Sequence, residues 1–100
     1  MNNFPFKEKF ITETDEFVEV IRIFEKNLTS KELVWHRDKE NRSVRLLNGE
    51  GWYLQMENEL PKKITANKSY YINSNVWHRI INKNGNKLEI ILRKYKWKKF

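Results

Sequence analysis

The sequence predicts a small, mainly antiparallel β protein with one helix near its N-terminus. From Leu28 onward, short runs of β-branched and aromatic residues alternate with turn residues, a pattern typical of an antiparallel sandwich or barrel. The 100 residues are the length of one domain with one modest core. We therefore expect a single domain over residues 1–100, with an arm and a helix in 1–27 and a barrel over 28–100.

The N-terminal part holds the expected helix. Residues 1–11 mix phenylalanine with lysine and glutamate, which indicates a short edge strand or an arm packed on the body. Thr12 is a candidate helix cap with Asp15 at the capping-box position. Apolar residues then recur at helical spacing, namely Phe17, Val20, Ile21 and Phe24. These signals predict a helix over 13–26, and the β-branched content of the same segment leaves a strand open as the alternative.

Seven strands are predicted after the helix. They lie near residues 32–38, 43–48, 51–57, 62–65, 69–73, 76–82 and 87–97, separated by segments rich in Asn, Gly, Lys and Glu. Asn84-Gly85 is the strongest hairpin signal, because both residue types tolerate the positive φ of a tight turn.

The two histidines of the chain occupy similar stretches, Val34-Trp35-His36-Arg37 and Val76-Trp77-His78-Arg79. In a strand, alternate side chains share a face, so His36 and Asp38 are expected to point the same way. If the two strands are neighbours or face each other, His36, Asp38 and His78 converge. Two imidazoles and one carboxylate form a metal-binding set that suits Fe(II) or a similar first-row ion.

The composition limits the kinds of metal site and covalent chemistry that the chain can have. The chain has no cysteine, which excludes disulfides, thiolate metal sites and thiol nucleophiles, so any metal must be held by His, Asp or Glu. No segment has the pattern of a signal peptide or the length of a membrane span. We expect a cytoplasmic protein that makes no contact with a membrane.

The net charge of +7 is concentrated at the C-terminus. Residues 93–100 carry five basic and no acidic residues, which leaves 15 basic and 13 acidic residues in the rest of the chain. Tyr95 and Trp97 alternate with these cations, as in a strip that binds single-stranded nucleic acid. A solvated edge strand or a dimer contact explains the same residues, so we do not expect nucleic acid as the main partner.

The spacing of the two histidine segments resembles the motifs of the cupin family, small β-barrels of jelly-roll topology. The first cupin motif, G-x5-H-x-H-x3-4-E-x6-G, aligns with His36, Asp38, Arg42 and Gly49. The second, G-x5-P-x-G-x2-H-x3-N, aligns with a further set of residues, namely Asn67, Asn73, Asn75, His78 and Asn82. The resemblance covers about residues 30–92 and implies a jelly-roll barrel.

The departures from these motifs are of two kinds. Asn67 and Asn75 replace glycines, and asparagine is the residue type next most tolerant of left-handed backbone, so the fold is unaffected. Asp38 replaces a histidine ligand and Arg42 replaces the glutamate ligand. The remaining His36, Asp38 and His78 resemble the H-x-D…H triad of iron oxygenases built on a related barrel.

Arg42 leaves the nature of the site open. Its guanidinium can clamp an anionic ligand bidentately, or pair with Asp38 and remove that carboxylate as a ligand. A metal-free site is the second possibility, in which Asp38 orients His36 or His78 as a general base, as in cupin sugar epimerases. Arg45, Gln55 and Trp52 are further candidates to line the pocket, and core packing is the other explanation for the large side chain of Trp52.

The resemblance implies a function class. We expect a homodimeric cupin that binds a small anionic molecule in the barrel, with a divalent Fe, Mn, Ni or Zn ion held by His36, His78 and Asp38. An enzyme of this kind would be a metal-dependent oxygenase, isomerase or lyase. The alternatives are a metal-free binding or epimerase-like cupin that uses a His-Asp pair, and a basic module that binds nucleic acid through its C-terminal strand.

Overall fold

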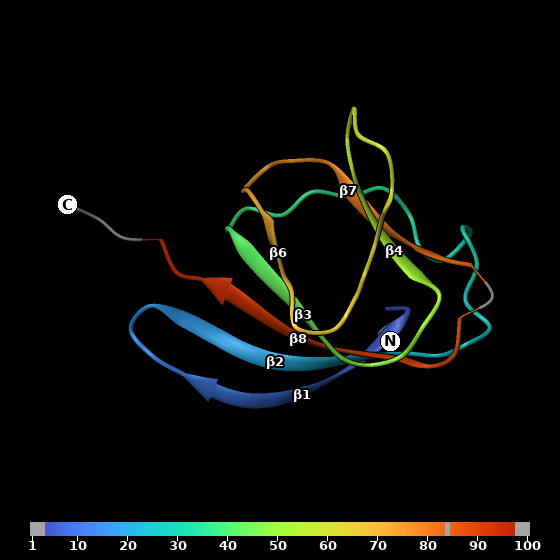
Figure 1. The fold of residues 1–100 in the computed structure, drawn as a ribbon. Helices are drawn as coiled ribbons and strands as arrows, with labels where there is room; N and C mark the ends of the chain where they lie inside the picture. Colours follow the sequence, from blue (N-terminus) through green and yellow to red (C-terminus); the bar gives the residue numbers. More distant parts are fainter. Residues whose placement is uncertain (1–3, 84, 98–100) are drawn as a thin grey trace.

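The computed structural model describes residues 4–83 and 85–97, and these form an all-β fold of two antiparallel sheets. The strands are β1 (Phe6–Glu13), β2 (Phe17–Phe24), β3 (Arg42–Asn48), β4 (Trp52–Met56), β5 (Lys62–Lys63), β6 (Ser69–Ile72), β7 (His78–Asn82) and β8 (Leu88–Tyr95). The larger sheet has the order β1-β2-β8-β3-β6 and the smaller has the order β5-β4-β7. Figure 1 shows β4 and β7 across the molecule from β1, β2 and β8. The predicted antiparallel β class is confirmed.

The predicted helix over 13–26 is wrong, and the strand alternative is confirmed. β2 occupies this segment and pairs along its length with β1 on one side and β8 on the other. Thr14, in the turn between β1 and β2, accepts hydrogen bonds at Oγ1 from the N–H groups of Glu16 and Phe17. The strand preference of the β-branched residues is therefore confirmed, and the helical spacing of the apolar residues is coincidental.

The C-terminal strand is not an edge strand, contrary to the sequence-based interpretation. β8 lies between β2 and β3 in the larger sheet. Its cations lie beside carboxylates of the N-terminal hairpin: Arg93 pairs with Glu19 at 2.6 Å and Lys94 lies 3.6 Å from Glu8. The charge at this terminus is therefore partly compensated inside the sheet, which weakens the case for a nucleic-acid strip there.

Most predicted strands are present, with two corrections. The segment 32–38 is not a strand, because after a turn over 29–33 its backbone pairs with β7 through an isolated bridge at His36. The predicted hairpin at Asn84-Gly85 is also wrong as a pairing, since β7 pairs with β4 whereas β8 pairs with β2 and β3. Asn84 itself lies outside the described residues.

The asparagines at motif glycine positions adopt the conformation expected of them. Asn67 and Asn75 have φ values of 61° and 63°. Asn58, in the loop between β4 and β5, has the same left-handed backbone at φ 61°. At Gly49 a side chain is excluded, because φ is 131° and a Cβ would lie 2.8 Å from the carbonyl oxygen of Lys87. Asparagine therefore replaces glycine in the motif turns where a positive φ is the only requirement.

The core fills the space between the two sheets. Its buried residues come from both, with Trp52 and Leu88 fully buried at 1% and 0% exposure. Phe24 from β2 packs on Trp52 from β4, with ring centroids 5.9 Å apart. Within residues 4–83 and 85–97, the buried polar residues are His78 and Ser43. Among the residues that the structure describes, there is no helix long and apolar enough to cross a membrane.

Candidate metal centre

The two histidines face each other across a backbone bridge. The N–H of His36 donates to the carbonyl of His78 at 3.0 Å, and the N–H of His78 donates to the carbonyl of His36 at 2.8 Å. Directly opposed residues of an antiparallel pair point to the same face, so both imidazoles lie on one face, with His78 buried and His36 exposed. Their ring centroids lie 4.3 Å apart. The convergence of His36 and His78 predicted from the sequence is therefore present, although the segment around His36 is not a strand.

The hydrogen bonds of the two rings select the same tautomer. Nδ1 of His36 lies 3.0 Å from the carbonyl oxygen of Val34, and Nδ1 of His78 lies 2.8 Å from that of Val76. A carbonyl oxygen only accepts, so each Nδ1 carries the proton and donates. In each neutral ring, Nε2 then keeps its lone pair. This pattern, in which Nδ1 is held by a backbone carbonyl, is common in metal-binding histidines.

Asp38 completes the group. Its Oδ2 lies 3.2 Å from Nε2 of His78, is buried, and accepts no hydrogen bond from any described residue. One potential ligand atom from each of His36, Asp38 and His78 lies within 4.8 Å of the other two. Ligand atoms bound about 2.1 Å from one first-row ion are separated by about 3.0 to 3.4 Å, which matches the contact between Asp38 and His78. The Asp38 and His78 atoms therefore have the separation of two ligands of one cation, and His36 lies close enough to be a third.

Arg42 contacts the site from the side of Asp38. Its Nε and Nη2 donate to Oε1 of Glu40 at 2.9 and 2.7 Å, and Nη2 lies 3.4 Å from Oδ1 of Asp38. Of the roles open to Arg42, the structure has the ion pair with Asp38. That pair engages Oδ1 and leaves Oδ2 facing the histidines. Glu40, which the sequence reasoning missed, holds the guanidinium in place.

The electrostatics of the group follow from this arrangement. Burial raises the pKa of Asp38, but the interaction with His78 and the positive charge of Arg42 outweigh it, so its pKa lies below the usual value. Desolvation of the His36 ring lowers its pKa, and the neighbouring His78 lowers it further. An ionised carboxylate and a neutral imidazole are the protonation states that metal binding requires.

Loop contacts fix the position of Asp38. The N–H of Asn75 donates to the carbonyl of Asp38 at 2.7 Å, and the N–H of Ser74 donates to Oδ1 of Asn41 at 2.7 Å. On the other side of His36, the buried side chain of Leu33 anchors the turn that precedes it. The loop before β7 and the segment before β3 are therefore held together by the residues that flank the site.

The motif residue Asn82 has a structural role. Its Nδ2 donates to the carbonyls of Lys26 and Leu28 at 2.8 and 3.0 Å, and its Oδ1 accepts from the N–H of Gly85 at 2.7 Å. It thereby ties the end of β7 to the segment that leads toward His36.

A cavity of about 280 Å³ lies along β4 and β6, and none of the three candidate ligands lines it. Met56 lines it and is the direct partner of His78 in the pairing of β4 with β7. Its lining also includes Leu54, Glu59, Lys62, Lys68, Ser69, Tyr70 and Tyr71. Lys62 lies 3.5 Å from Glu59, and the ammonium of Lys68 lies 5.4 Å from the ring centroid of Tyr70. The sequence signalled Tyr70 and Tyr71 as strand aromatics, but nothing in it pointed to Met56 or the two lysines.

The other predicted pocket residues lie away from the histidines. Arg45 is exposed on β3, and Trp52 is buried in the core, where its Nε1 donates to the carbonyl of Asn86 at 2.6 Å. Gln55 accepts a hydrogen bond at 3.0 Å from Arg79. Gln55 and Arg79 are direct partners in strands whose inward residues are Met56 and His78, so both face outward. The structure does not bring these three residues to the site.

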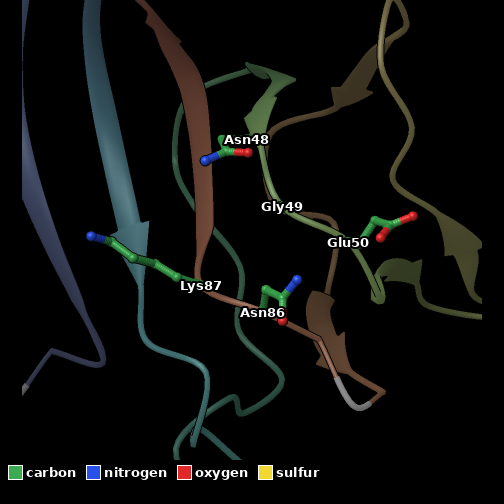
Figure 2. A pocket seen from close by; sticks show the side chains of 5 residues that line it. All are labelled: Asn48, Gly49, Glu50, Asn86 and Lys87. Atoms are coloured by element: carbon green, nitrogen blue, oxygen red, sulfur yellow. The ribbon is translucent and has the colours of Figure 1, made fainter.

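A second, polar hollow of about 250 Å³ lies at the opposite end of β4. Figure 2 shows its lining residues, Asn48, Gly49, Glu50, Asn86 and Lys87. These residues adjoin Trp52, at the start of β4, whereas His78 pairs with Met56 at its end. At about 3.3 Å per residue, the two ends of this strand are about 13 Å apart. The hollow is therefore separate from the histidine site.

Comparison with solved structures identifies the fold. An RmlC-like cupin with a double-stranded β-helix fold from Methanocaldococcus jannaschii superposes with a TM-score of 0.71 over 94% of this chain and 83% of its own, at 17% identity. The chain has the cupin fold. A putative mannose-6-phosphate isomerase from Ralstonia eutropha is similar at a TM-score of 0.76 and 12% identity, over 92% of this chain and 85% of its own.

KdgF from Halomonas sp. is a third structure with the cupin fold of this chain, at a TM-score of 0.71 and 13% identity over 93% of this chain and 81% of its own. No family model matches the chain, and no curated protein matches it in sequence. Within the cupin fold, His36, Asp38 and His78 form a group that fits a metal-binding role.

Proposed function

We propose that this cupin binds a divalent first-row metal ion through His36, His78 and Asp38. The observation that carries the proposal is the convergence of three unused lone pairs. Both histidines commit Nδ1 to a backbone carbonyl, which leaves Nε2 as the electron donor, and Oδ2 of Asp38 is buried beside them without a hydrogen bond from the described residues. Three converging acceptors repel one another, and a bound cation would remove this repulsion.

The second part of the proposal is a small anionic ligand beside the metal. Met56, the direct strand partner of His78, lines a cavity that Lys62 and Lys68 border, and Arg42 adds a fixed positive charge next to Asp38. Glu59 neutralises Lys62 in part, whereas Lys68 contacts only the ring of Tyr70 among the described residues. A carboxylate or phosphate entering the cavity would therefore gain charge-assisted hydrogen bonds.

In such a complex, the metal ion, the two histidines and Arg42 would each have a different role. A bound metal ion would supply Lewis acidity or redox chemistry of the kind used by oxygenases, isomerases and lyases. His36 and His78 would keep their orientation through the Val34 and Val76 carbonyls. Arg42, held by Glu40, would balance the charge of Asp38 and attract the anion.

The experiment is elemental analysis of the protein purified without chelators or immobilised-metal columns. We expect near-stoichiometric metal in the natural chain, or its uptake from Fe(II), Mn(II), Ni(II) or Zn(II). It should be lost in His78→Ala and His36→Gln. The exposed His36 is the safer substitution for folding, and circular dichroism verifies that both variants remain folded. Full metal content in both folded variants would refute the proposal.

The close contact of Asp38 with His78 favours a second candidate. In a metal-free site, the carboxylate 3.2 Å from Nε2 would orient a protonated His78 and tune it as a general acid or base. Of the two histidines that the sequence allowed as the partner of Asp38, the 3.2 Å contact favours His78. Failure of the natural protein to bind any of the four metals would support it, and screening would then begin with small sugars and carboxylates.

A further inference from the structure

The tryptophans and arginines of the two Trp-His-Arg stretches lie on the face of the smaller sheet opposite the histidines. The bridge between His36 and His78 places Trp35 against Arg79 and Arg37 against Trp77. The guanidinium of Arg79 lies 4.7 Å from the ring centroid of Trp35, and that of Arg37 lies 5.3 Å from Trp77. Both tryptophans remain accessible, at 39% and 41% exposure. The repeated sequence thus builds a second surface besides the metal centre.

This surface continues across β4 to β5. Tyr53 pairs with Ile81 on β7 and with Lys63 on β5, so these three side chains share the outward face. The ammonium of Lys83 lies 4.9 Å from the Tyr53 ring centroid. We call the set the outer platform: Trp35, Arg37, Tyr53, Lys63, Trp77, Arg79 and Lys83. With neighbouring strands about 4.8 Å apart, it is about 14 Å wide.

No carboxylate of the described residues forms an ion pair with the cations of the outer platform. Within the described residues, Arg37 contacts only the ring of Trp77, and Arg79 contacts the ring of Trp35 and the amide oxygen of Gln55. On the larger sheet, by contrast, arginines pair with glutamates, as Arg93 does with Glu19. Glu57 shares the outward face by strand alternation, but it forms no ion pair with the platform.

We propose that the outer platform binds a short segment of single-stranded nucleic acid. Arg79 donates from Nε to Gln55, and its Nη groups and the guanidinium of Arg37 form no ion pair with a described residue, so they can bind phosphate. The exposed indole rings of Trp35 and Trp77 and the half-buried phenol ring of Tyr53 offer stacking surfaces for bases. Cations and aromatic rings alternate over a width that accommodates a few nucleotides, and the chain as a whole carries a charge of +7.

An acidic peptide is the competing occupant, and the exposed rings argue against it. A peptide of Asp and Glu would pair with the cations but would bring no aromatic group to stack on the exposed rings of Trp35 and Trp77. A single strand uses both kinds of group, because each nucleotide brings one phosphate and one aromatic base. This surface is also distinct from the C-terminal strip, where the cations lie beside glutamates.

The test is fluorescence anisotropy of labelled oligo-dT and oligo-U of 12 nucleotides over a series of salt concentrations. The variants are Trp77→Leu and the double variant Arg37→Gln/Arg79→Gln. Arg45→Gln is the matched control, because Arg45 is exposed on the other sheet and contacts no aromatic ring among the described residues. Circular dichroism and metal content, compared with the natural chain, verify that the fold and the histidine site are intact.

We expect Trp77→Leu to weaken binding about fivefold or more, the usual effect of removing one stacking ring. The double variant should reduce the slope of log affinity against log salt by about 1.4, because about 0.7 is lost for each phosphate contact on a single strand. Arg45→Gln should bind as the natural chain does. A preference between oligo-dT and oligo-U identifies DNA or RNA as the partner.

Three outcomes would overturn the proposal. The first is no binding to either oligonucleotide at low salt. The second is equal binding by the platform variants and the natural chain. The third is displacement of the labelled oligonucleotide by poly-glutamate as effectively as by unlabelled oligonucleotide. The second outcome would assign the observed binding to the basic C-terminal segment, residues 93–100. The third would identify an acidic protein as the partner. Because metal content is measured in parallel, failure here is distinguishable from failure of the metal centre.

Discussion

Replacing Asp38 with asparagine distinguishes two hypotheses, a metal centre and a charged His-Asp pair. The two hypotheses predict different stabilities of the metal-free variant. If Nδ1 of His78 carries the only ring proton, Nε2 and Oδ2 are two acceptors 3.2 Å apart. The asparagine NH₂ could then donate to Nε2, a gain of about 1 kcal/mol. Weakening of the contact between Asp38 and Arg42 opposes this gain, although Arg42 keeps two hydrogen bonds to Glu40.

These opposing effects give a small net change for Asp38→Asn. We expect a change in unfolding free energy within about 1 kcal/mol, and a shift in melting temperature within about 8 °C for a chain of this length. If His78 is instead protonated and paired with Asp38, the substitution breaks a buried ion pair. That costs about 3 to 5 kcal/mol, which lowers the melting temperature by about 12 °C or more. The side chains are 5% and 15% exposed, so the contact is shielded from solvent.

The assay is thermal unfolding followed by circular dichroism in excess EDTA, together with calorimetric metal titration. Metal affinity should fall by more than the 10- to 100-fold that loss of a supporting partner costs, because a ligand itself is removed. Asp15→Asn, in the exposed turn between β1 and β2, is the matched control and should change neither quantity. A loss of 3 kcal/mol or more in EDTA would refute the tautomer reasoning, and unchanged metal affinity would refute the role of Asp38 as a ligand.

Three further predictions follow from the same contacts. Arg42→Met should raise metal affinity several-fold, because it removes a cation 3.4 Å from a ligand carboxylate; calorimetric titration measures this, and weaker binding would contradict it. The pKa of His36 is lower in the folded chain, so the unfolded chain binds more protons below about pH 6.5. The contribution of His36 to stability is therefore complete above that pH, and it is lost as the pH falls through the folded pKa. Urea unfolding in EDTA at pH 7.5 and pH 5 should therefore show a larger loss for the natural chain than for His36→Gln. Leu88→Ala should cost about 2 to 5 kcal/mol in urea unfolding, because Leu88 is fully buried between the sheets, and a cost below 1 kcal/mol would contradict this packing.

Sequence reasoning failed where local patterns allow two structures. The apolar residues of β2 fit a helical stripe as well as a strand, and pairing with β1 and β8 decides between them. The basic C-terminal segment looked like an edge because lysines are common on edges. Its neighbours are glutamates of the N-terminal hairpin, more than 70 residues away in the chain, as in the pair of Arg93 with Glu19. Such long-range pairing leaves no local signal.

The sequence by itself determined the antiparallel β class, the motif turns and the identity of the three candidate ligands. These follow from short-range chemistry: side-chain alternation, the left-handed tolerance of Asn67 and Asn75, and the small choice of ligands in a chain without cysteine. Only the tertiary structure decided that Asp38 faces His78, that Arg42 is held by Glu40, and that the repeated Trp-Arg pairs form one outer surface. Those facts depend on which segments become neighbours, and neighbours are selected by burial of the whole core rather than by any one stretch of residues.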